Sequence, residues 1–141
     1  MINTKELLDL DLFCDLNQSE AEEVSSILSF MQVHEGEVLS QKGQPAHTFY
    51  LIISGDYMVH FDNGRAFTIH EKGQIIGWSA VVTPFRYRGT SIALTNGEVI
   101  AMKGRELLKL IQGNSNLGDK IMAKVNEGVA KRMSFIQGTN E

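Results

Sequence analysis

The stretch GEVLSQKGQPAHTFYLIISG, residues 36–55, gives the clearest structural signal in the chain. Its glycines, at positions 36, 43 and 55, separate short runs rich in β-branched and aromatic residues. The same pattern continues outward, with further glycines at positions 64, 73, 77, 89 and 97. Short β-rich runs between turn residues at intervals of about ten are typical of a sandwich or barrel. We therefore expect an all-β unit over residues 31–104.

Candidate strands lie between these glycines. They are Met31–His34, Glu37–Ser40, Thr48–Ser54, Asp56–Asp62, Arg65–Glu71, Arg88–Leu94 and Glu98–Lys103. Ser54-Gly55-Asp56 forms one turn, and Asp62–Arg65 contains the Asn-Gly pair that suits a two-residue hairpin with positive φ. Apolar residues alternate at Tyr57, Val59 and Phe61, which predicts that one face of this hairpin packs on a core.

Helical patterns flank the β-rich region. Ser19, with Glu22 at the third helical position, predicts a helix start within residues 1–30. After Gly104, helical periodicity predicts a short helix over 105–112 and a long helix over 117–137, with a turn between them that supplies caps. The apolar residues on one side of the long helix are Ile121, Met122, Val125, Val129, Met133 and Ile136.

Composition excludes several classes of protein. The 141 residues fit one domain, and no apolar run approaches the roughly 20 residues that a membrane helix needs. The acidic start of the chain does not resemble a secretion signal, and a single cysteine, Cys14, favours a reducing compartment. We therefore expect a cytoplasmic protein. The net charge of −4 and the scattered lysines and arginines give no basis for direct nucleic-acid binding.

Signatures of catalysis are absent from the sequence. The four histidines, His34, His47, His60 and His70, never occur in the HxH or HxxxH spacings that present two metal ligands together. A cupin-like metalloenzyme is therefore the least favoured hypothesis for this chain. The sequence also lacks a GxSxG elbow, a P-loop and a GxGxxG that opens a helix after a strand. We expect neither enzymatic activity nor a bound metal.

The stretch from Gly73 to Ser91 differs from an ordinary strand and turn. It combines glycines, a short apolar segment, two arginines and several hydroxyls. Glycine permits close backbone approach to a ligand, a helical turn after it presents free N–H groups, and arginine with hydroxyls can hold an anion. The stretch could therefore bind a phosphate. The alternative is a loop that leaves Arg86 and Arg88 in solvent and places Trp78 in the core.

The chain resembles the cyclic-nucleotide-binding domain of catabolite activator proteins and protein kinase A regulatory subunits. The matching segments are Gly36–Leu39, Lys42–Ala46, Phe49–Ile52, Ser54-Gly55, Gly73, Gly77, Ala80-Val81 and Arg88, and the likeness extends from Leu12 to about Ile136. The resemblance implies a mainly β fold, a β-roll or jelly roll (double-stranded β-helix), with an N-terminal helix and a long C-terminal helix. One domain, 1–141, would then contain helical residues 1–30, the roll at 31–104 and helices at 105–137.

The resemblance also implies a ligand and its site. The ligand would be cyclic AMP, cyclic GMP or a related small anion. The candidate binding residues are Gly77, Trp78, Ser79, Ala80, Arg86, Arg88, Thr90 and Ser91. Arg88 is our choice for the residue that meets the negative charge, with Arg86 as the fallback. The family has Gly-Glu where this chain has Gly77-Trp78, so the acceptor for the ribose hydroxyl is missing. Losing that hydrogen bond weakens binding by about ten- to a hundredfold.

Two functional hypotheses follow. In the first, the chain is a ligand-sensing regulatory module; in the second, Trp78 fills the ribose position and the fold serves as a scaffold for protein interaction. Catabolite-activator-type regulators continue into a DNA-binding domain, whereas this chain ends at Glu141, so we expect an unidentified downstream protein partner.

The resemblance further implies a parallel homodimer along the long helix. Met122, Val125, Val129 and Ile136 have the spacing of a coiled-coil seam, which Arg132 interrupts. The alternative is that this apolar stripe packs entirely on its own β-roll.

Overall fold

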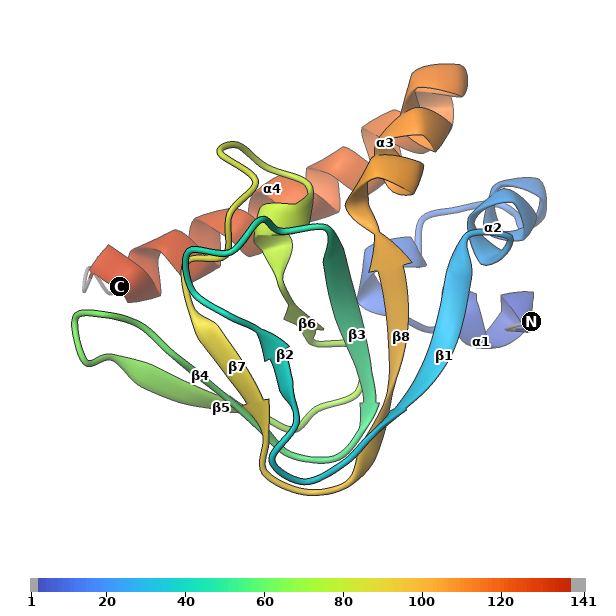
Figure 1. Ribbon diagram of the computed structural model, residues 1–141. Helices are drawn as coiled ribbons and strands as arrows, with labels where there is room; N and C mark the ends of the chain where they lie inside the picture. Colours follow the sequence, from blue (N-terminus) through green and yellow to red (C-terminus); the bar gives the residue numbers. More distant parts are fainter. Residues whose placement is uncertain (1–2, 138–141) are drawn as a thin grey trace.

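Two antiparallel sheets of four strands face each other and form a β-roll (Figure 1). The computed structural model describes the backbone of residues 3–137 and the side chains of residues 3–132. One sheet has the strand order β1-β8-β3-β6, and the other has the order β2-β7-β4-β5. The strands are β1 (Leu28–Val33), β2 (Val38–Ser40), β3 (Thr48–Ser54), β4 (Tyr57–His60), β5 (Ala66–Ile69), β6 (Ile75–Ile76), β7 (Thr90–Ala93) and β8 (Gly97–Lys103).

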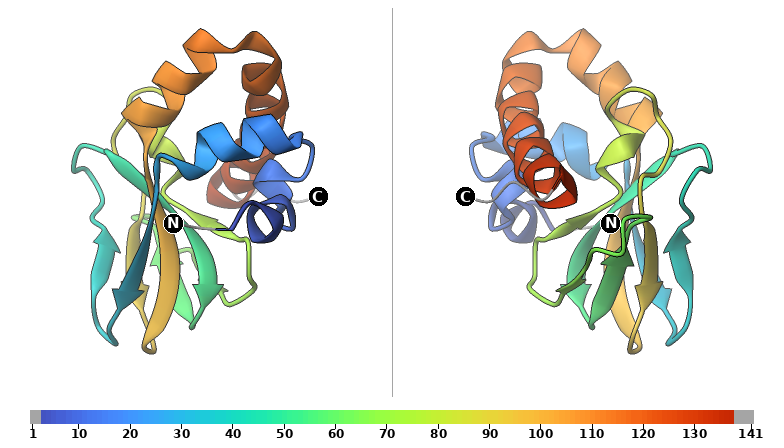
Figure 2. Two further views of the ribbon diagram at one scale, coloured as in Figure 1. Left: turned by 90° about the vertical axis from the view of Figure 1, so that its right-hand side faces the viewer. Right: turned by 90° about the vertical axis from the view of Figure 1, so that its left-hand side faces the viewer.

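Helices cover one side and one end of the roll (Figure 2). They are α1 (Thr4–Leu8), the 3-10 turn η1 (Asp11–Phe13), α2 (Gln18–Ser25), the 3-10 turn η2 (Trp78–Ala80), α3 (Gly104–Gly113) and α4 (Ser115–Gln137). The expected fold class, a mainly β roll with an N-terminal helix and a long C-terminal helix, is therefore confirmed. Asn114, in the predicted cap-supplying turn, accepts a hydrogen bond from the Leu117 N–H at 3.2 Å.

Each of the seven predicted strands corresponds to an observed one, most with ends shifted by one or two residues, and two larger differences remain. β1 begins at Leu28, three residues earlier than expected, because Leu28 pairs with Met102 of β8. β6 was not predicted at all. It has only two residues, both buried, and pairs with Tyr50 and Leu51 of β3. A strand this short has no period to detect, so only its neighbours define it.

The connection between β4 and β5 also differs from expectation. The Phe61 N–H donates to the Arg65 carbonyl at 2.9 Å, which leaves a loop of residues 62–64. Gly64 alone has positive φ in this loop, at +84°, whereas a two-residue turn would need the same conformation at Asn63. The Asn-Gly signal thus located the hairpin correctly and gave the wrong loop length.

The N-terminal helix starts earlier than Ser19. Asn17 is the N-cap: its side chain accepts from the Glu20 N–H at 2.8 Å, and the Glu20 carboxylate accepts from the Asn17 N–H at 2.9 Å. Both Asn17 and Ser19 are followed three residues later by glutamate, so the sequence offers two capping boxes. The Lys120 ammonium lies 2.7 Å from Glu20, and this tertiary contact accompanies the first of them.

Two clusters of buried side chains form the core. The cluster inside the roll includes Tyr57, Val59 and Phe61, as their alternation predicted, together with Ile52 and Val99. The second cluster lies between the helices and the outer face of the first sheet, where Phe49 and Leu51 of β3 and Ile100 of β8 contact residues of α1, α2, α3 and α4.

The apolar stripe of α4 packs largely on its own domain. Leu117, Ile121 and Val125 are 0% exposed, and Met122 and Val129 pack against the same cluster. Val125 is therefore not available for the expected seam with a second copy of the helix, and the alternative arrangement is the one observed for it. The side chain of Ile136 lies outside the described residues. The exposed face of α4 carries Ala123, Asn126, Glu127, Ala130 and Lys131.

Candidate functional site

A left-handed glycine sets the geometry of the candidate site. Gly77, between β6 and η2, has φ +93°. A Cβ at this position would lie 3.1 Å from the Thr48 carbonyl oxygen and 3.3 Å from a ring carbon of Tyr87. Only glycine fits without strain. The turn lets the chain leave the sheet and places η2 at the end of the roll that α4 crosses (Figure 1).

A small cavity lies where η2, the roll and α4 meet, with a volume of about 50 Å³. Its lining residues are Ser40, Val59, Phe61, Gly77, Trp78, Ser79, Val82, Tyr87, Arg88, Gly89, Ser91, Val129 and Arg132. We call this space the roll cavity. Its polar wall includes the buried hydroxyls of Ser40 and Ser91, which are hydrogen-bonded to each other at 2.5 Å. The same wall thus combines hydroxyls, an arginine and the backbone around η2.

The structure brings together only part of the predicted site. Gly77, Trp78, Ser79, Arg88 and Ser91 line the roll cavity. The other three candidates do not line it. The Arg86 guanidinium donates to the Gly43 carbonyl at 2.9 Å, and the Thr90 hydroxyl accepts from the Lys42 N–H at 3.1 Å. The Ala80 N–H donates to the Gly77 carbonyl at 3.0 Å, within the turn itself.

Arg132 of α4 is the cavity residue that sequence reasoning missed. Its guanidinium donates to the Ile75 carbonyl at 3.0 Å and lies over the Phe67 ring, 4.6 Å from the centroid. Within residues 3–132, no carboxylate forms an ion pair with it. Burial lowers the pKa of Arg132 to about 10. The sequence contained one indication of this role: Arg132 occupies a position in the apolar stripe of the helix, and such a position faces the protein interior.

Trp78 forms a wall of the site and does not fill the interior of the roll. Its ring stacks on Phe49 of β3, with centroids 6.4 Å apart and planes inclined by 14°. Its other neighbour is Gly128 of α4, where an added Cβ would lie 2.8 Å from Cε2 and 2.9 Å from Cη2 of the indole. The glycine in the middle of this helix is therefore explained by contact with Trp78.

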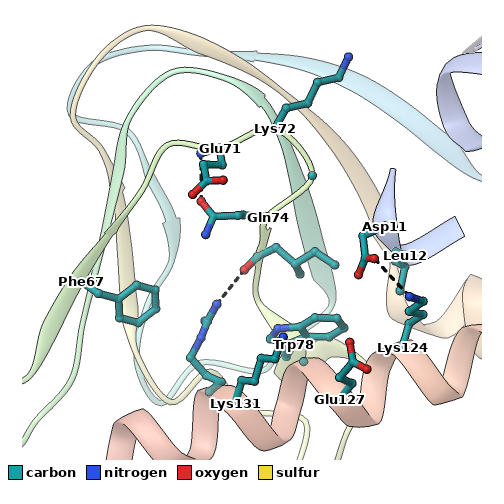
Figure 3. Close-up of a pocket in the computed structure, with 14 residues that line it drawn as sticks. Asp11, Leu12, Phe67, Glu71, Lys72, Gln74, Trp78, Lys124, Glu127 and Lys131 are labelled. Carbon is teal, nitrogen blue, oxygen red and sulfur yellow. Dashed lines mark hydrogen bonds and ion pairs between the residues drawn. The ribbon is translucent and has the colours of Figure 1, made fainter. Parts of the chain in front are cut away.

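A second, larger cavity lies on the other side of Trp78 and Arg132 (Figure 3). Its volume is about 510 Å³, and it is bounded by η1, the segment Glu71–Ile75 and α4. Charges of both signs face it. The Lys124 ammonium pairs with Asp11 at 3.2 Å, which holds η1 against α4. This outer cavity and the roll cavity share only Trp78 and Arg132 as lining residues.

Comparison with known proteins identifies the fold family. The sequence model of the cyclic nucleotide-binding domain matches residues 30–114. The chain belongs to the cyclic nucleotide-binding domain family. A curated protein of Rhodopseudomonas palustris, named as a potassium channel protein, is 25% identical over 124 residues. The match covers 86% of this chain but only 30% of that relative.

Solved structures with this fold resemble the chain closely in shape. A Geobacter metallireducens protein described as cyclic nucleotide-binding superposes with a TM-score of 0.84 at 21% identity, covering 94% of this chain and 99% of that one. The sensor domain of the transcriptional regulator DNR from Pseudomonas aeruginosa gives a TM-score of 0.74 at 19% identity, covering 94% and 96%. At these identities the likeness establishes the fold.

Two tyrosine hydroxyls of the roll, those of Tyr50 and Tyr87, have raised pKa values. The Tyr87 hydroxyl donates to the Thr48 carbonyl, and burial raises the pKa of Tyr87. Burial likewise raises the pKa of Tyr50 to about 12.

All four histidines are exposed, and the described residues contain no cluster of histidine, cysteine or carboxylate side chains that could hold a metal. In the described part of the chain, no helix is long and apolar enough to span a membrane.

Proposed function

We propose that this chain is a non-catalytic, ligand-sensing regulatory module that binds a cyclic nucleotide or a related small anion in the roll cavity. The observation that carries the proposal is the make-up of that cavity, because its walls combine η2 and strand β7 with Val129 and Arg132 of α4. A ligand that enters it must contact α4. The position of α4 would then report whether the site is occupied. A domain of the same fold, that of DNR, is described as a sensor domain.

The charge of the ligand is expected to be negative. Arg88 and Arg132 both line the roll cavity, and the described carboxylates do not. A phosphate or carboxylate that entered would provide a counter-ion for Arg132, whose charge burial disfavours. The hydroxyl of Ser91 lies on the same wall and could turn from Ser40 toward the ligand.

The size of the cavity implies that α4 moves when a nucleotide binds. Small-molecule sites usually have volumes of roughly 300–1,000 Å³. The roll cavity, at about 50 Å³, is too small for a nucleotide while Val129 and Arg132 cover it. Leu117, Ile121 and Val125 are fully buried, so the first half of α4 is expected to stay in place while the second half swings outward.

Titration calorimetry with cyclic AMP and cyclic GMP tests the proposal. We expect heat with one of them, and Trp78, the single tryptophan, should report binding through its fluorescence. Arg88→Ala should weaken binding by about ten- to a hundredfold, since hydrogen bonds to charged groups contribute about 1.5–3 kcal/mol. Arg86→Ala is the matched control, because Arg86 points to the Gly43 carbonyl. Absence of heat and of thermal stabilisation across nucleotides and small organic acids would refute the sensor proposal.

A second candidate is a domain that keeps the fold as a scaffold for protein interaction, and it rests on Trp78 replacing the family's glutamate, although the indole does not lie inside the roll. The indole fits tightly between Phe49 and Gly128, at the position where the family has a glutamate. Trp78→Glu would supply the missing acceptor. Gain of cyclic-nucleotide binding in this variant, with none in the wild type, would favour the scaffold.

Both proposed functions require a protein partner that binds this chain. We place the chain in the cytoplasm and expect a downstream protein partner, with no direct contact to nucleic acid or membrane. A homodimer through α4 remains part of the proposal, but it has to use the exposed face of the helix, because Val125 is buried in the core.

A further inference from the structure

A groove outside the roll cavity gathers positive charge on an acidic protein. It has a volume of about 1020 Å³ and lies between α3 and the loops that precede β3 and β7. Its lining residues are Pro45, Ala46, His47, Ala80, Phe85, Lys103, Arg105, Leu108, Lys109 and Gln112. We call it the basic groove. It shares no lining residue with the roll cavity, so it is a separate site, and the inference drawn from it does not rest on the proposed function.

One face of α3 forms a wall of the basic groove. Arg105, Leu108, Lys109 and Gln112 follow steps of three, one and three residues, which places all four on the same side of a helix. Lys103, at the end of β8, adds a third cation. The opposite wall is the segment Pro45–His47 together with Phe85.

The cations of the groove have no ion-pair or side-chain hydrogen-bond partner among the described residues. Lys103, Arg105 and Lys109 are exposed, and none of them forms an ion pair or a side-chain hydrogen bond with another described residue. No carboxylate lines the groove. Three other lysines of the described chain, Lys42, Lys120 and Lys124, each contact an aspartate or glutamate. On a protein with a net charge of −4, three cations at one groove without a lining carboxylate form a local concentration of positive charge.

An exposed aromatic residue borders the same charges. Phe85 is 40% exposed and has φ +60°, a left-handed conformation that a bulky side chain rarely adopts. Its N–H donates to the Val82 carbonyl at 2.9 Å, and its carbonyl accepts from the Ala46 N–H at 2.7 Å. These bonds fix the strained backbone and hold the ring at the groove, next to the apolar surfaces of Pro45 and Leu108. Strain of this kind is concentrated at binding sites.

We propose that the basic groove binds an acidic peptide segment of a partner protein, one that carries an apolar side chain among its carboxylates. The carboxylates would meet Arg105, Lys109 and Lys103, and the apolar side chain would pack on Phe85 and Leu108. A helix of ten residues is about 15 Å long, enough to contact roughly five residues of an extended peptide. Nucleic acid is a poorer match, because three cations neutralise few phosphates and apolar residues line much of the groove.

The groove borders η2, the turn that also lines the roll cavity through Trp78 and Ser79. Ala80 of η2 lines the groove, and Gly104 at the start of α3 abuts Ala80, where an added Cβ would lie 3.1 Å from the Ala80 Cβ. A peptide in the groove therefore touches both η2 and α3. It would be sensitive to any shift between them.

Fluorescence anisotropy with labelled twelve-residue peptides tests the proposal. The probe contains aspartate and glutamate around one leucine and one phenylalanine; two comparison peptides replace the acidic residues with lysine or the apolar residues with serine. We expect the acidic-apolar probe to bind at least about tenfold more tightly than either comparison peptide, and less tightly as salt rises. The double variant R105E/K109E should weaken binding of the probe by about tenfold or more.

The matched control is K72E/K131E, which makes the same change in net charge at two exposed lysines outside the groove. It should leave binding of the probe within about twofold. Phe85→Asn, which tolerates the left-handed backbone, should reduce the preference for the apolar peptide. Equal loss in both double variants, or no preference for the acidic-apolar probe, would overturn the proposal. So would groove-dependent binding of duplex DNA in place of the probe, or self-association that R105E/K109E abolishes, since these assign the groove to nucleic acid or to a second copy.

Discussion

A single residue, Arg132, connects the roll cavity with α4. Its guanidinium is held by one carbonyl, that of Ile75, and by the ring of Phe67, without a carboxylate among the described residues. Arg132 is partly buried, and a cation with so few partners in that position costs stability, because desolvation is only partly offset. The pKa of Arg132 falls to about 10 for this reason, so at every pH below about 10 the cost is fully present. The proposed function accounts for an arginine at this position, since an anionic ligand in the roll cavity would provide its counter-ion.

Arg132→Met should therefore raise the stability of the ligand-free protein and lower its affinity for an anionic ligand. Methionine keeps much of the volume and removes the desolvated charge, and replacing buried ions with apolar residues is often neutral or stabilising by about 1–4 kcal/mol. We expect a higher urea midpoint at neutral pH and weaker binding of any anionic ligand of the roll cavity. Arg132→Lys, which keeps the charge, should not show the gain in stability. A lower midpoint for Arg132→Met would mean that Arg132 has a purely structural role.

Among the elements, the contact between η2 and α4 is the tightest feature of the candidate site. Gly128 lies in a helix, where glycine costs about 1 kcal/mol relative to alanine. Glycine is nevertheless the residue that fits here, because the Trp78 ring occupies the space that a side chain at position 128 would need. The two elements are thus fitted to each other, and one cannot shift without the other.

Gly128→Ala should destabilise the protein, in the opposite direction to helix propensity. The new methyl group overlaps the indole, and overpacking of this kind typically costs about 1–3 kcal/mol. Gly113→Ala is the control, since no atom lies within 4 Å of the added Cβ at that position of α3. It should be neutral or slightly stabilising. Urea unfolding followed by Trp78 fluorescence measures both; equal stability of the two variants would show that Trp78 moves aside freely.

An element could be predicted from the sequence where the residues that define it are neighbours in the chain. The strands around Gly36, Gly43 and Gly55 were predictable because period-two alternation and turn residues lie next to each other in the chain. β6 was not, since its two residues are a strand only through pairing with β3. In the site, Gly77 and Arg88 belong to one recognisable stretch, whereas Arg132 reaches the cavity from a distant helix. Only the fold brings it there.

Across the whole molecule, α4 is attached differently along its length. Its first half is tied to the N-terminal segment by the pairs Lys120–Glu20 at 2.7 Å and Lys124–Asp11 at 3.2 Å. The Lys120 hydrogen bond lowers the pKa of Glu20, so this link is present at neutral pH and is lost as the solution becomes acidic enough to protonate the carboxylate. The second half covers the roll cavity. This difference between the two halves of α4 agrees with the proposed outward movement of its second half when a ligand binds.

The buried stripe of α4 gives the last prediction, which separates the two ways in which this helix could be used. Val125→Asp places a carboxylate at a position that is 0% exposed, so it should abolish cooperative folding instead of producing a folded monomer. Ala123→Asp and Ala130→Asp put the same charge on the exposed face and should leave the domain folded. Sedimentation velocity and thermal unfolding of the three variants measure both properties. If the wild type is a dimer that the Ala123 or Ala130 variant dissociates, the outer face of α4 is the interface; a folded, monomeric Val125→Asp would contradict the packing of α4 on its own core.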